Sequence, residues 1–433
     1  MTRPAAFLSA ARLPSLLLAV ALLPASAAAD VLLVDDDGPA DHATVQAAID
    51  AATAGDIVLV RAGTYPGFIL DGKALTIAGL GPATTSVRTS GPSFVRNIAA
   101  GEQVLLTGLD LRGVDGEATA PLGHGLVLRA SAGALRVQHC LVFGGDLGSP
   151  FDAADGGRTA GPADGGTNGG PGAAAISIDN CDDVVLIDVG CEGAIGPGSL
   201  TGPGGVGGTG LHISRSHVTT FDCNLLGGFG GSAHPAGTDV GGRGGVGVKV
   251  TRHSTLVSLG GAITGGWGGW SGEFGLQSTG GTALEVESDA LARLRDTELT
   301  GGFGSFDVGC TCNGPMGATF VGPGPLIAVP GVPPAFTALP AVAAPGGLLS
   351  LTGDAPLLVL AGLETLSEYV PAAQGSLFVA PPWIGDGLLL PSLPVDVAVP
   401  GPLGLDGLVL HLQAYGADGL GQAASLVLLE TLP

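Results

Sequence analysis

The aromatic residues with the most distinctive spacing lie in glycine-rich segments. The chain of 433 residues has three tryptophans, and Trp267 and Trp270 stand three residues apart in the sequence Gly-Gly-Trp-Gly-Gly-Trp. Phe303 and Phe306 repeat that spacing one repeat unit later, and Phe229 holds the first of the two places one unit earlier. We therefore expect a ladder of Phe229, Trp267 and Phe303, and we take all five rings as candidate ligand-binding residues.

Two interpretations of this aromatic ladder are open. The rings can pack the glycine-rich loops against the rest of the protein. Alternatively, they can form a platform on which sugar rings stack, flanked by backbone donors that glycine leaves exposed.

A run of three carboxylates, Asp35, Asp36 and Asp37, precedes Gly38-Pro39. Calcium prefers carboxylate oxygens, but acids before Gly-Pro are also typical of a solvated turn. We do not expect three adjacent side chains to face one ion together. The sequence therefore gives no metal site and no cofactor, and calcium binding at this run stays an open question.

Six cysteines offer a second kind of chemistry. Counted back from the glycine that opens each glycine-rich segment, Cys140 and Cys223 share one offset and Cys191 lies close to it, which predicts that they stack on successive repeats. One disulfide among them is feasible, and packing as small free thiols is the alternative. Cys310 and Cys312 would make a strained bridge with each other, and the four-cysteine spacing of a zinc site is absent.

The elements that carry these residues are copies of one pattern, which occurs five times between about residues 123 and 309. Each copy has a short alternating strand, a polar turn, a second apolar run and a glycine-rich excursion, and the last four copies recur every 35 to 37 residues. This period predicts a β-solenoid with rungs roughly 4.8 Å apart. Alternation places an apolar column inside, formed by Leu126, Leu128, Ile176, Ile178, Leu211, Ile213, Val248, Val250, Leu284 and Val286.

The N-terminal residues 1–29 have the features of a secretion signal. Arg3 and Arg12 flank the start of a short apolar run at 16–23, and small residues near Ala27 fit a cleavage site. We expect an exported protein, secreted or held at the cell surface, whose mature chain begins near Ala28 or Asp30 and contains at least one disulfide. A formal charge of −22 argues against nucleic acid and anionic membranes as partners, and the sequence predicts no transmembrane segment.

The segment after the signal predicts a cap for the solenoid. A strand at 31–34 is followed by an amphipathic helix from about Asp41 to Ala54 and a strand at 57–60. These segments, with the Val-Asp-Asp-Asp-Gly sequence that starts at Val34, resemble the N-terminal cap and first coil of secreted right-handed parallel β-helix proteins, the pectin-lyase-like superfamily. The resemblance covers roughly residues 31–310. It implies that fold, but it does not specify an activity, because the superfamily includes lyases, hydrolases and adhesins.

Four regions are predicted along the chain: a signal peptide at 1–29, a parallel β-helix with glycine-rich loops at 30–312, a Pro/Gly linker at 313–334, and a β-sandwich at 335–433. Short apolar runs separated by turns predict the sandwich. It resembles the C-terminal all-β module of some bacterial secreted repeat proteins, which implies attachment, sorting or capping. The predicted fold class is all-β.

Catalytic groups are sparse in this sequence. Polysaccharide-cleaving members of the superfamily need clustered carboxylates, or calcium ligands beside an Arg or Lys. Gly123-His124-Gly125 matches a short hydrolase motif, but Asp182-Asp183 follows it rather than precedes it. The outward columns of the repeats mix both charges and are typical of a solvated face: Arg129, Asp179, Ser214, Thr251 and Glu287 in one, Val127, Ser177, His212, Lys249 and Glu285 in the other.

From these observations we predict a non-catalytic β-helix protein of the cell surface or extracellular matrix that builds structure, binds glycans, or both. The alternative is a polysaccharide lyase or a glycoside hydrolase. A close carboxylate cluster in a groove would favour the enzyme, and an unbroken mixed-charge face would favour the binding protein.

Overall fold

The computed structural model divides into two compact units, Asp30–Val332 and the C-terminal Pro333–Pro433. It describes residues 29–88, 93–113, 123–145, 172–199, 202–233, 240–271, 277–305, 314–344, 348–354, 356–381, 388–390, 394–398, 408–417 and 419–429. The predicted signal peptide therefore lies outside the described residues, except for Ala29. Among the described residues, no helix is both long and apolar enough to cross a membrane.

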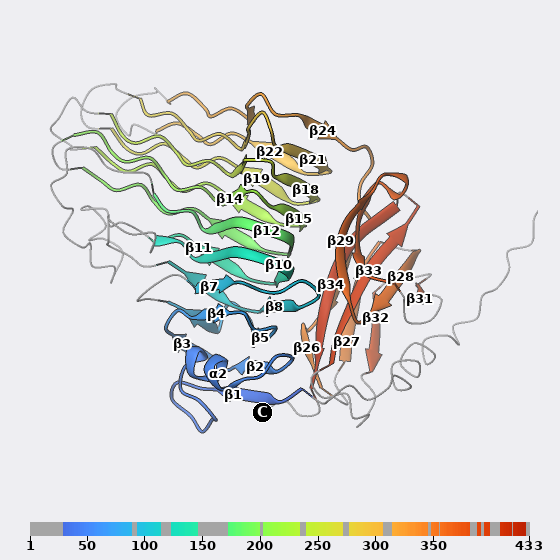
Figure 1. Ribbon diagram of the computed structural model, residues 1–433. Coiled ribbons are helices and arrows are strands. Elements are labelled where there is room, and N and C mark those ends of the chain that lie inside the picture. Colours follow the sequence, from blue (N-terminus) through green and yellow to red (C-terminus); the bar gives the residue numbers. More distant parts are fainter. Residues whose placement is uncertain are drawn as a thin grey trace, which may run out of the picture. The chain divides into compact units, whose positions relative to one another are not determined.

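The first unit is a parallel β-helix, in which every strand pairing is parallel and successive turns of chain stack as rungs (Figure 1). The main path of its 16-stranded sheet is β1 (Val31–Val34), β2 (Ile57–Val60), β5 (Thr76–Gly79), β8 (Gln103–Thr107), β10 (Leu126–Gln138), β12 (Ile176–Ile187), β14 (Leu211–Ser214), β17 (Val248–Thr251), β20 (Leu284–Val286) and β23 (Phe320–Val321). Branching from this path are β4 (Ile69–Asp71), β7 (Ser93–Arg96), β15 (His217–Phe221), β18 (Thr255–Leu259), β21 (Leu291–Arg295) and β24 (Leu326–Ala328).

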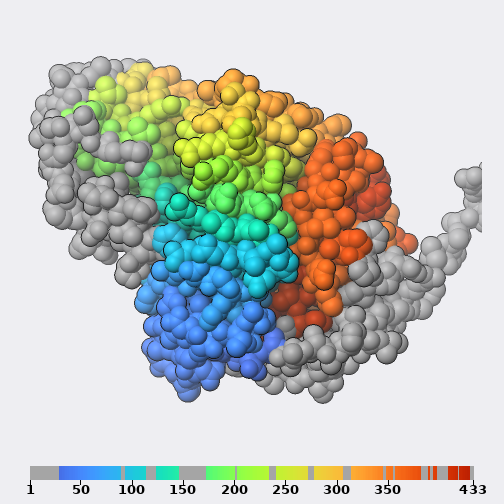
Figure 2. Space-filling view, viewed as in Figure 1, coloured from blue at the N-terminus to red at the C-terminus, as the bar shows by residue number. Residues whose placement is uncertain are grey.

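A second sheet of eight parallel strands forms another wall of the solenoid. Its strands follow chain order: β3 (Gly63–Tyr65), β6 (Thr85–Val87), β9 (Asp110–Arg112), β11 (Leu141–Phe143), β13 (Gly190–Glu192), β16 (Asn224–Leu226), β19 (Ala262–Thr264) and β22 (Glu298–Thr300). In the space-filling view the rungs stack in sequence order from blue to orange (Figure 2). The predicted right-handed parallel β-helix is confirmed as the fold.

The predicted register of the repeats is confirmed residue by residue. Leu126 pairs with Ile176, Ile176 with Leu211, Leu211 with Val248, and Val248 with Leu284. All ten predicted inward residues are buried in one continuous apolar cluster. Since a one-residue slip would turn this whole set to solvent, the alternation determines the register.

The corners between strands are built from residues with left-handed backbone. One corner repeats at Asn180, Arg215 and Arg252, with φ of 57°, 50° and 50°, and the next repeats at Asp188 and Asp222, with φ of 49° and 50°. Most of these side chains are polar and solvent-facing, and Asn and Asp tolerate this region better than most residues. The corners therefore recur at equivalent positions, which keeps the strands of successive rungs in register.

The N-terminal end of the apolar column is covered by helix α2 (Val45–Ala51), which buries Val45, Ala48 and Ile49. This helix is shorter than the predicted 41–54, because Thr44 acts as its N-cap and Ala52 already has extended backbone. Lys73 Nζ donates to the carbonyl oxygens at the C-terminal end of the helix, those of Ile49, Asp50 and Ala52, at 2.7 to 3.1 Å. These bonds satisfy carbonyl groups that a helix leaves unpaired.

The glycine-rich excursions form a projection of two hydrogen-bonded layers. We call the segments that leave the eight-stranded sheet the outgoing legs: 193–199, 227–233, 265–271 and 301–305. The segments that return to the 16-stranded sheet are the return legs: 172–175, 202–210, 240–247, 277–283 and 314–319. Figure 1 shows legs of successive rungs running side by side beyond the strands.

The backbone hydrogen bonds of the legs repeat every three residues. In the outgoing leg 227–233, the first residue of each triplet donates to the next rung, as Gly230 does to the Trp267 carbonyl at 2.8 Å. The second residue donates across to the return layer, as Gly228 does to the Gly208 carbonyl at 2.7 Å. The third residue of each triplet makes neither of these bonds, and its side chain faces outward. A three-residue period is that of a polyproline II helix, and the hydrogen bonds join the legs into a lattice.

Glycine is required in this lattice because the legs approach each other backbone to backbone. A Cβ atom on Gly245 would lie 1.9 Å from the Gly208 oxygen, and one on Gly231 would lie 2.1 Å from the Pro197 oxygen. No side chain fits at such a distance. The Gly-Gly-x triplets are therefore a packing requirement of the two-layer lattice.

The predicted linker at 313–334 contains a further partial rung. Strand β23 pairs with β20, and β24 pairs with β21. The Gly and Pro residues that predicted a linker lie in the turns around these short strands, which explains why the strands were missed.

The C-terminal unit is the predicted β-sandwich. One sheet has β25 (Phe336–Leu339), β27 (Leu348–Gly353) and β32 (Val395–Ala398). The other has β26 (Val342–Ala343), β34 (Gly419–Leu428), β33 (Leu408–Gly416), β28 (Leu357–Gly362) and β31 (Leu388–Leu390), and β29 (Thr365–Val370) pairs with β30 (Gly375–Val379). Residues of both larger sheets share one apolar core, among them Phe336, Leu351, Val359 and Leu412.

The four cysteines within the described residues, Cys140, Cys181, Cys191 and Cys223, are buried and free. Of the two arrangements left open for Cys140, Cys191 and Cys223, a disulfide or small free thiols, the structure has the free thiols. The strand register places Val189 between Cys140 and Cys223 in one column, and Cys191 lies two residues further along its strand. The predicted stacking of the three cysteines is therefore wrong, because it aligned the repeats on their glycines rather than on their corners. Cys310 and Cys312 lie outside the described residues.

We expect these four thiols to be unreactive in the folded protein. Burial raises the pKa of Cys140, Cys181 and Cys223 to about 12, and it also raises the pKa of Cys191, so the reactive thiolate is scarce at pH 8. In a variant carrying Cys310→Ser and Cys312→Ser, intact mass after iodoacetamide should show no adduct before denaturation. It should show four adducts after denaturation without reductant. Fewer than four would reveal a disulfide.

Candidate functional site

The predicted aromatic ladder lies on the outer face of the outgoing layer. Phe229, Trp267 and Phe303 occupy the third, outward place of their triplets in successive rungs. The ring centroids of Phe229 and Trp267 are 5.5 Å apart, and those of Trp267 and Phe303 are 5.6 Å apart. Trp267 is 41% exposed and Phe303 is 43% exposed. The three rings therefore form a contiguous and accessible apolar strip.

Trp270 occupies the next outward place of its leg and is 40% exposed, so it extends the strip sideways. Phe306, the fifth candidate, lies outside the described residues.

The rings of the ladder stand edge to face and are not coplanar. The ring planes of Phe229 and Trp267 meet at 67°, and those of Trp267 and Phe303 meet at 87°. Such edge contacts are favourable in themselves. Because adjacent rings are nearly perpendicular, a flat ligand stacks on one of them and contacts the edges of its neighbours.

Backbone polar groups surround the ladder in a regular array. Within the described residues, the N–H groups of Phe229 and Ser232 donate to no protein atom, and the carbonyl groups of Gly227 and Gly230 accept no hydrogen bond. These are the groups that the three-residue lattice leaves unused. A ligand on the rings therefore meets both donors and acceptors at intervals of one triplet, roughly 9 Å.

A groove lies on a different face, over strands β7, β10, β12, β14 and β17. Its volume is about 660 Å³. Its lining includes Phe94, Arg96, His124, Arg129, Asp179, His212, Lys249, Arg252 and Glu287. Several of these residues belong to the outward columns that the repeats predicted. Phe94 and Arg96 were not anticipated, because their rung precedes the clear repeats.

Burial disfavours the charged form of both histidines in the groove and so lowers their pKa. Burial lowers the pKa of His124, whose Nδ1 lies 3.0 Å from the Ala174 carbonyl oxygen. Burial also lowers the pKa of His212, and the positive charge of Lys249 adds to that effect. His212 Nε2 lies 3.5 Å from Thr251 Oγ1.

The carboxylates of the groove are far apart and engaged. Asp179 and Glu287 share one outward column but are separated by three rungs, roughly 14 Å, whereas glycosidases hold two carboxyl groups within about 5–9.5 Å. Asp179 is bound by Arg215 at 2.7 Å, and Glu287 accepts from the Arg252 backbone N–H at 3.2 Å.

The other acidic residues considered from the sequence are also engaged elsewhere. Glu285 is 3.6 Å from Lys249 and 3.9 Å from Arg243. Asp183, of the Asp182-Asp183 pair, makes a bidentate ion pair with Arg136, at 2.8 and 2.6 Å. Among the described residues, the groove therefore has the mixed-charge face that the outward columns predicted.

The lowered pKa of His212 gives an expected pH dependence. The unfolded chain takes up the His212 proton near its usual pKa of about 6.5, whereas the folded chain takes it up only at lower pH. Its contribution to stability is therefore complete above about pH 6.5 and is lost as the pH falls from there toward the lower, folded pKa. We expect His212→Gln to reduce the fall in melting temperature between pH 7 and pH 5.5. The control His253→Gln, at an exposed side chain, should not reduce this fall in melting temperature. Equal slopes for both variants would contradict the prediction.

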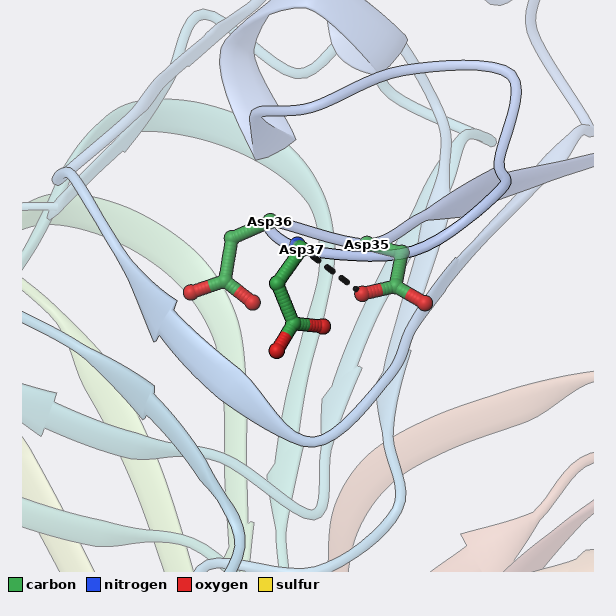
Figure 3. A group of neighbouring side chains, drawn as sticks. All are labelled: Asp35, Asp36 and Asp37. Atoms are coloured by element: carbon green, nitrogen blue, oxygen red, sulfur yellow. Dashed lines mark hydrogen bonds between the residues drawn. The ribbon is translucent and has the colours of Figure 1, made fainter.

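The acidic run Asp35, Asp36 and Asp37 is a compact cluster (Figure 3). One ligand atom from each residue lies within 4.8 Å of the others, so the three carboxylates lie closer together than the sequence led us to expect of adjacent side chains. The chain bends sharply after β1 and brings them together. Arg61 lies 3.0 Å from Asp35 and holds its pKa below the usual value, and Asp36 accepts from the Thr64 N–H at 3.0 Å. These contacts give the cluster a structural role at the first turn of the solenoid.

Comparison with known proteins gives similarity of structure alone. No protein-family model matches the sequence, and no curated protein matches it. Among solved structures, pectin methylesterase from carrot is 16% identical, with a TM-score of 0.29, and the match covers 69% of this chain and 90% of that one. Pectin methylesterase PemA from Erwinia chrysanthemi is 11% identical, with a TM-score of 0.28 and coverage of 70% and 90%.

The A-module of mannuronan C-5 epimerase AlgE6 from Azotobacter vinelandii is 14% identical, with a TM-score of 0.17 and coverage of 66% and 94%. At these TM-scores the assignment of the parallel β-helix rests on the strand register of this chain.

Proposed function

We propose that this protein is an exported, non-catalytic β-helix protein of the cell surface or extracellular matrix that binds glycans on the aromatic face of its glycine-rich projection. Export is inferred from the signal-like residues 1–29. The β-helix and its lattice provide a rigid support for the ligand-binding rings.

The observation that carries the proposal is the ladder of Phe229, Trp267 and Phe303 on the outgoing legs, in which Trp267 and Phe303 are exposed and Phe229 is half-buried. Soluble proteins rarely expose contiguous aromatic strips without a binding role. The rings offer apolar faces, and the unused N–H and carbonyl groups beside them match the hydroxyl groups of a sugar. The lattice fixes both kinds of group before binding, which lowers the entropy cost of association.

The arrangement of the groove supports a non-catalytic role. Its described carboxylates are separated by several rungs or engaged by cations and backbone donors, so none is placed as one of a general acid and base pair. In this groove, the alternative function, a polysaccharide lyase or hydrolase, would find a proton acceptor in His212 and a cation in the nearby Lys249.

A polysaccharide array scored for both binding and cleavage tests the proposal. We expect binding of at least one polysaccharide, with no new reducing ends or unsaturated products after prolonged incubation. Cleavage that is lost in His212→Asn would establish the enzyme instead. The absence of binding to every polysaccharide would overturn the glycan-binding function.

A further inference from the structure

The aromatic face is almost free of charge, and the charges that it has are negative. In the described parts of β11, β13, β16, β19 and β22, and of the outgoing legs that four of them feed, the charged side chains are those of Glu192 and Glu298. Glu298 is exposed and lies five residues before Phe303. Arg112, on the same sheet, is four rungs from Thr264, roughly 19 Å, and its guanidinium lies over the Phe143 ring at 4.4 Å.

The opposite face of the projection differs in charge. Its return layer presents Arg243 in the same outward column as Val206 and Thr279. The sheet that continues this layer carries Arg96, Arg129, Lys249 and Arg252 around the groove. Cations are therefore gathered on the groove side, and the aromatic face has none close to its rings among the described residues.

We propose that the aromatic face selects neutral glycans and rejects polyuronates. This inference rests on the proposed glycan-binding function and names its ligand class. A uronate polymer carries one carboxylate on each sugar ring, and each would have to give up water without gaining a cation. The nearby Glu298 and the overall charge of −22 add repulsion at low salt. The hydroxyl groups of a neutral sugar need only the uncharged backbone donors and acceptors that flank the rings.

The geometry also identifies a position at which this selectivity can be tested. Thr264 precedes Trp267 by one triplet, at the base of its outgoing leg, and is half-buried. A cation introduced there would reach a carboxylate on a sugar stacked at Trp267, because a lysine side chain extends its ammonium group well beyond the position of a threonine hydroxyl. Thr279 is the matched position on the opposite face, exposed on a return leg.

The experiment measures binding of matched hexasaccharides at low and high salt. The neutral set contains glucan, mannan, xylan and chitin oligomers, and the acidic set contains oligogalacturonate and oligomannuronate. We expect the best neutral ligand to bind at least roughly tenfold more tightly than either uronate at low salt. The difference should shrink as salt screens the repulsion. Binding of the neutral ligand should depend on Trp267.

The charge variants test the cause of the selectivity. Thr264→Lys should increase uronate affinity roughly tenfold and leave neutral binding unchanged, whereas Thr279→Lys should change neither at the ladder. Equal affinity of the wild type for neutral and acidic ligands, both dependent on Trp267, would overturn the selectivity and leave the glycan-binding function in place. A gain in uronate affinity for Thr264→Lys that is no larger than the gain for Thr279→Lys would also overturn the selectivity. Failure of the wild type to bind any oligosaccharide would overturn both the selectivity and the glycan-binding function.

Discussion

Replacement of Gly245 by alanine should destabilise the projection by about 3–5 kcal/mol, the cost of overpacking together with the loss of two or three hydrogen bonds. The new Cβ would lie 1.9 Å from the Gly208 oxygen, so one leg must move away from the other. That movement breaks the bond from the Gly245 N–H to the Gly228 carbonyl and the bond from Gly266 to Gly245.

The effect should be confined to the lattice, because each rung of a repeat array contacts mainly its neighbours. Hydrogen exchange should lose protection in the legs 227–233 and 265–271, while strands β14 and β17 keep theirs. Glycan binding should fall too, since Gly228 and Gly266 adjoin Phe229 and Trp267. The matched control is Val206→Ala, at a 41% exposed side chain of the return layer, which should cost less than about 0.5 kcal/mol. Similar melting curves and exchange for both variants would show that neighbouring legs can move apart without cost.

The sequence was sufficient for the β-helix because two independent periods agree. The recurrence of 35 to 37 residues sets the length of a rung, and the alternation of Leu211, His212 and Ile213 sets which side chains face the core. Together they predicted four strand pairings without error. The rungs before Leu126 have no repeat, so residues such as Phe94 and Arg96 could not be aligned with the groove.

The sequence was insufficient where a contact depends on two segments that are distant along the chain. The spacing of the aromatic residues predicted that Phe229 and Trp267 stack on successive rungs, and it left open whether the rings face outward. The Gly-Gly-x triplets could not reveal that outgoing and return legs bond across two layers, because the return legs have less regular triplets. The predicted stacking of the cysteines was wrong for a related reason. A corner with left-handed backbone, such as Asp188 or Asp222, sets the register of the following strand. The glycines that come after that strand do not set its register.

The candidate site was predicted in part. The order of the three rings follows from their spacing along the chain, and the structure adds their edge-to-face packing and the unused backbone groups beside them. The ring angles could not be predicted, because they depend on side-chain packing within a lattice that has no counterpart in ordinary strands. In the proposed glycan-binding function, the angles would limit face-on stacking to one ring at a time.

Replacement of Trp267 by alanine should weaken glycan binding by roughly 1–3 kcal/mol, by analogy with the loss of one stacking ring for a nucleic-acid base. The same change removes two edge contacts, with Phe229 and Phe303, each worth about 0.5–1.5 kcal/mol. A fully buried ring would cost about 3–5 kcal/mol, and a ring that is 41% exposed should cost less. Thermal melts and binding isotherms on the same variant separate the two effects. Trp267→Phe should recover part of both, and Met316→Ala, at an exposed side chain of the return layer, should alter neither. Unchanged affinity with a large loss of stability would show that the ladder is a packing element and not a binding surface.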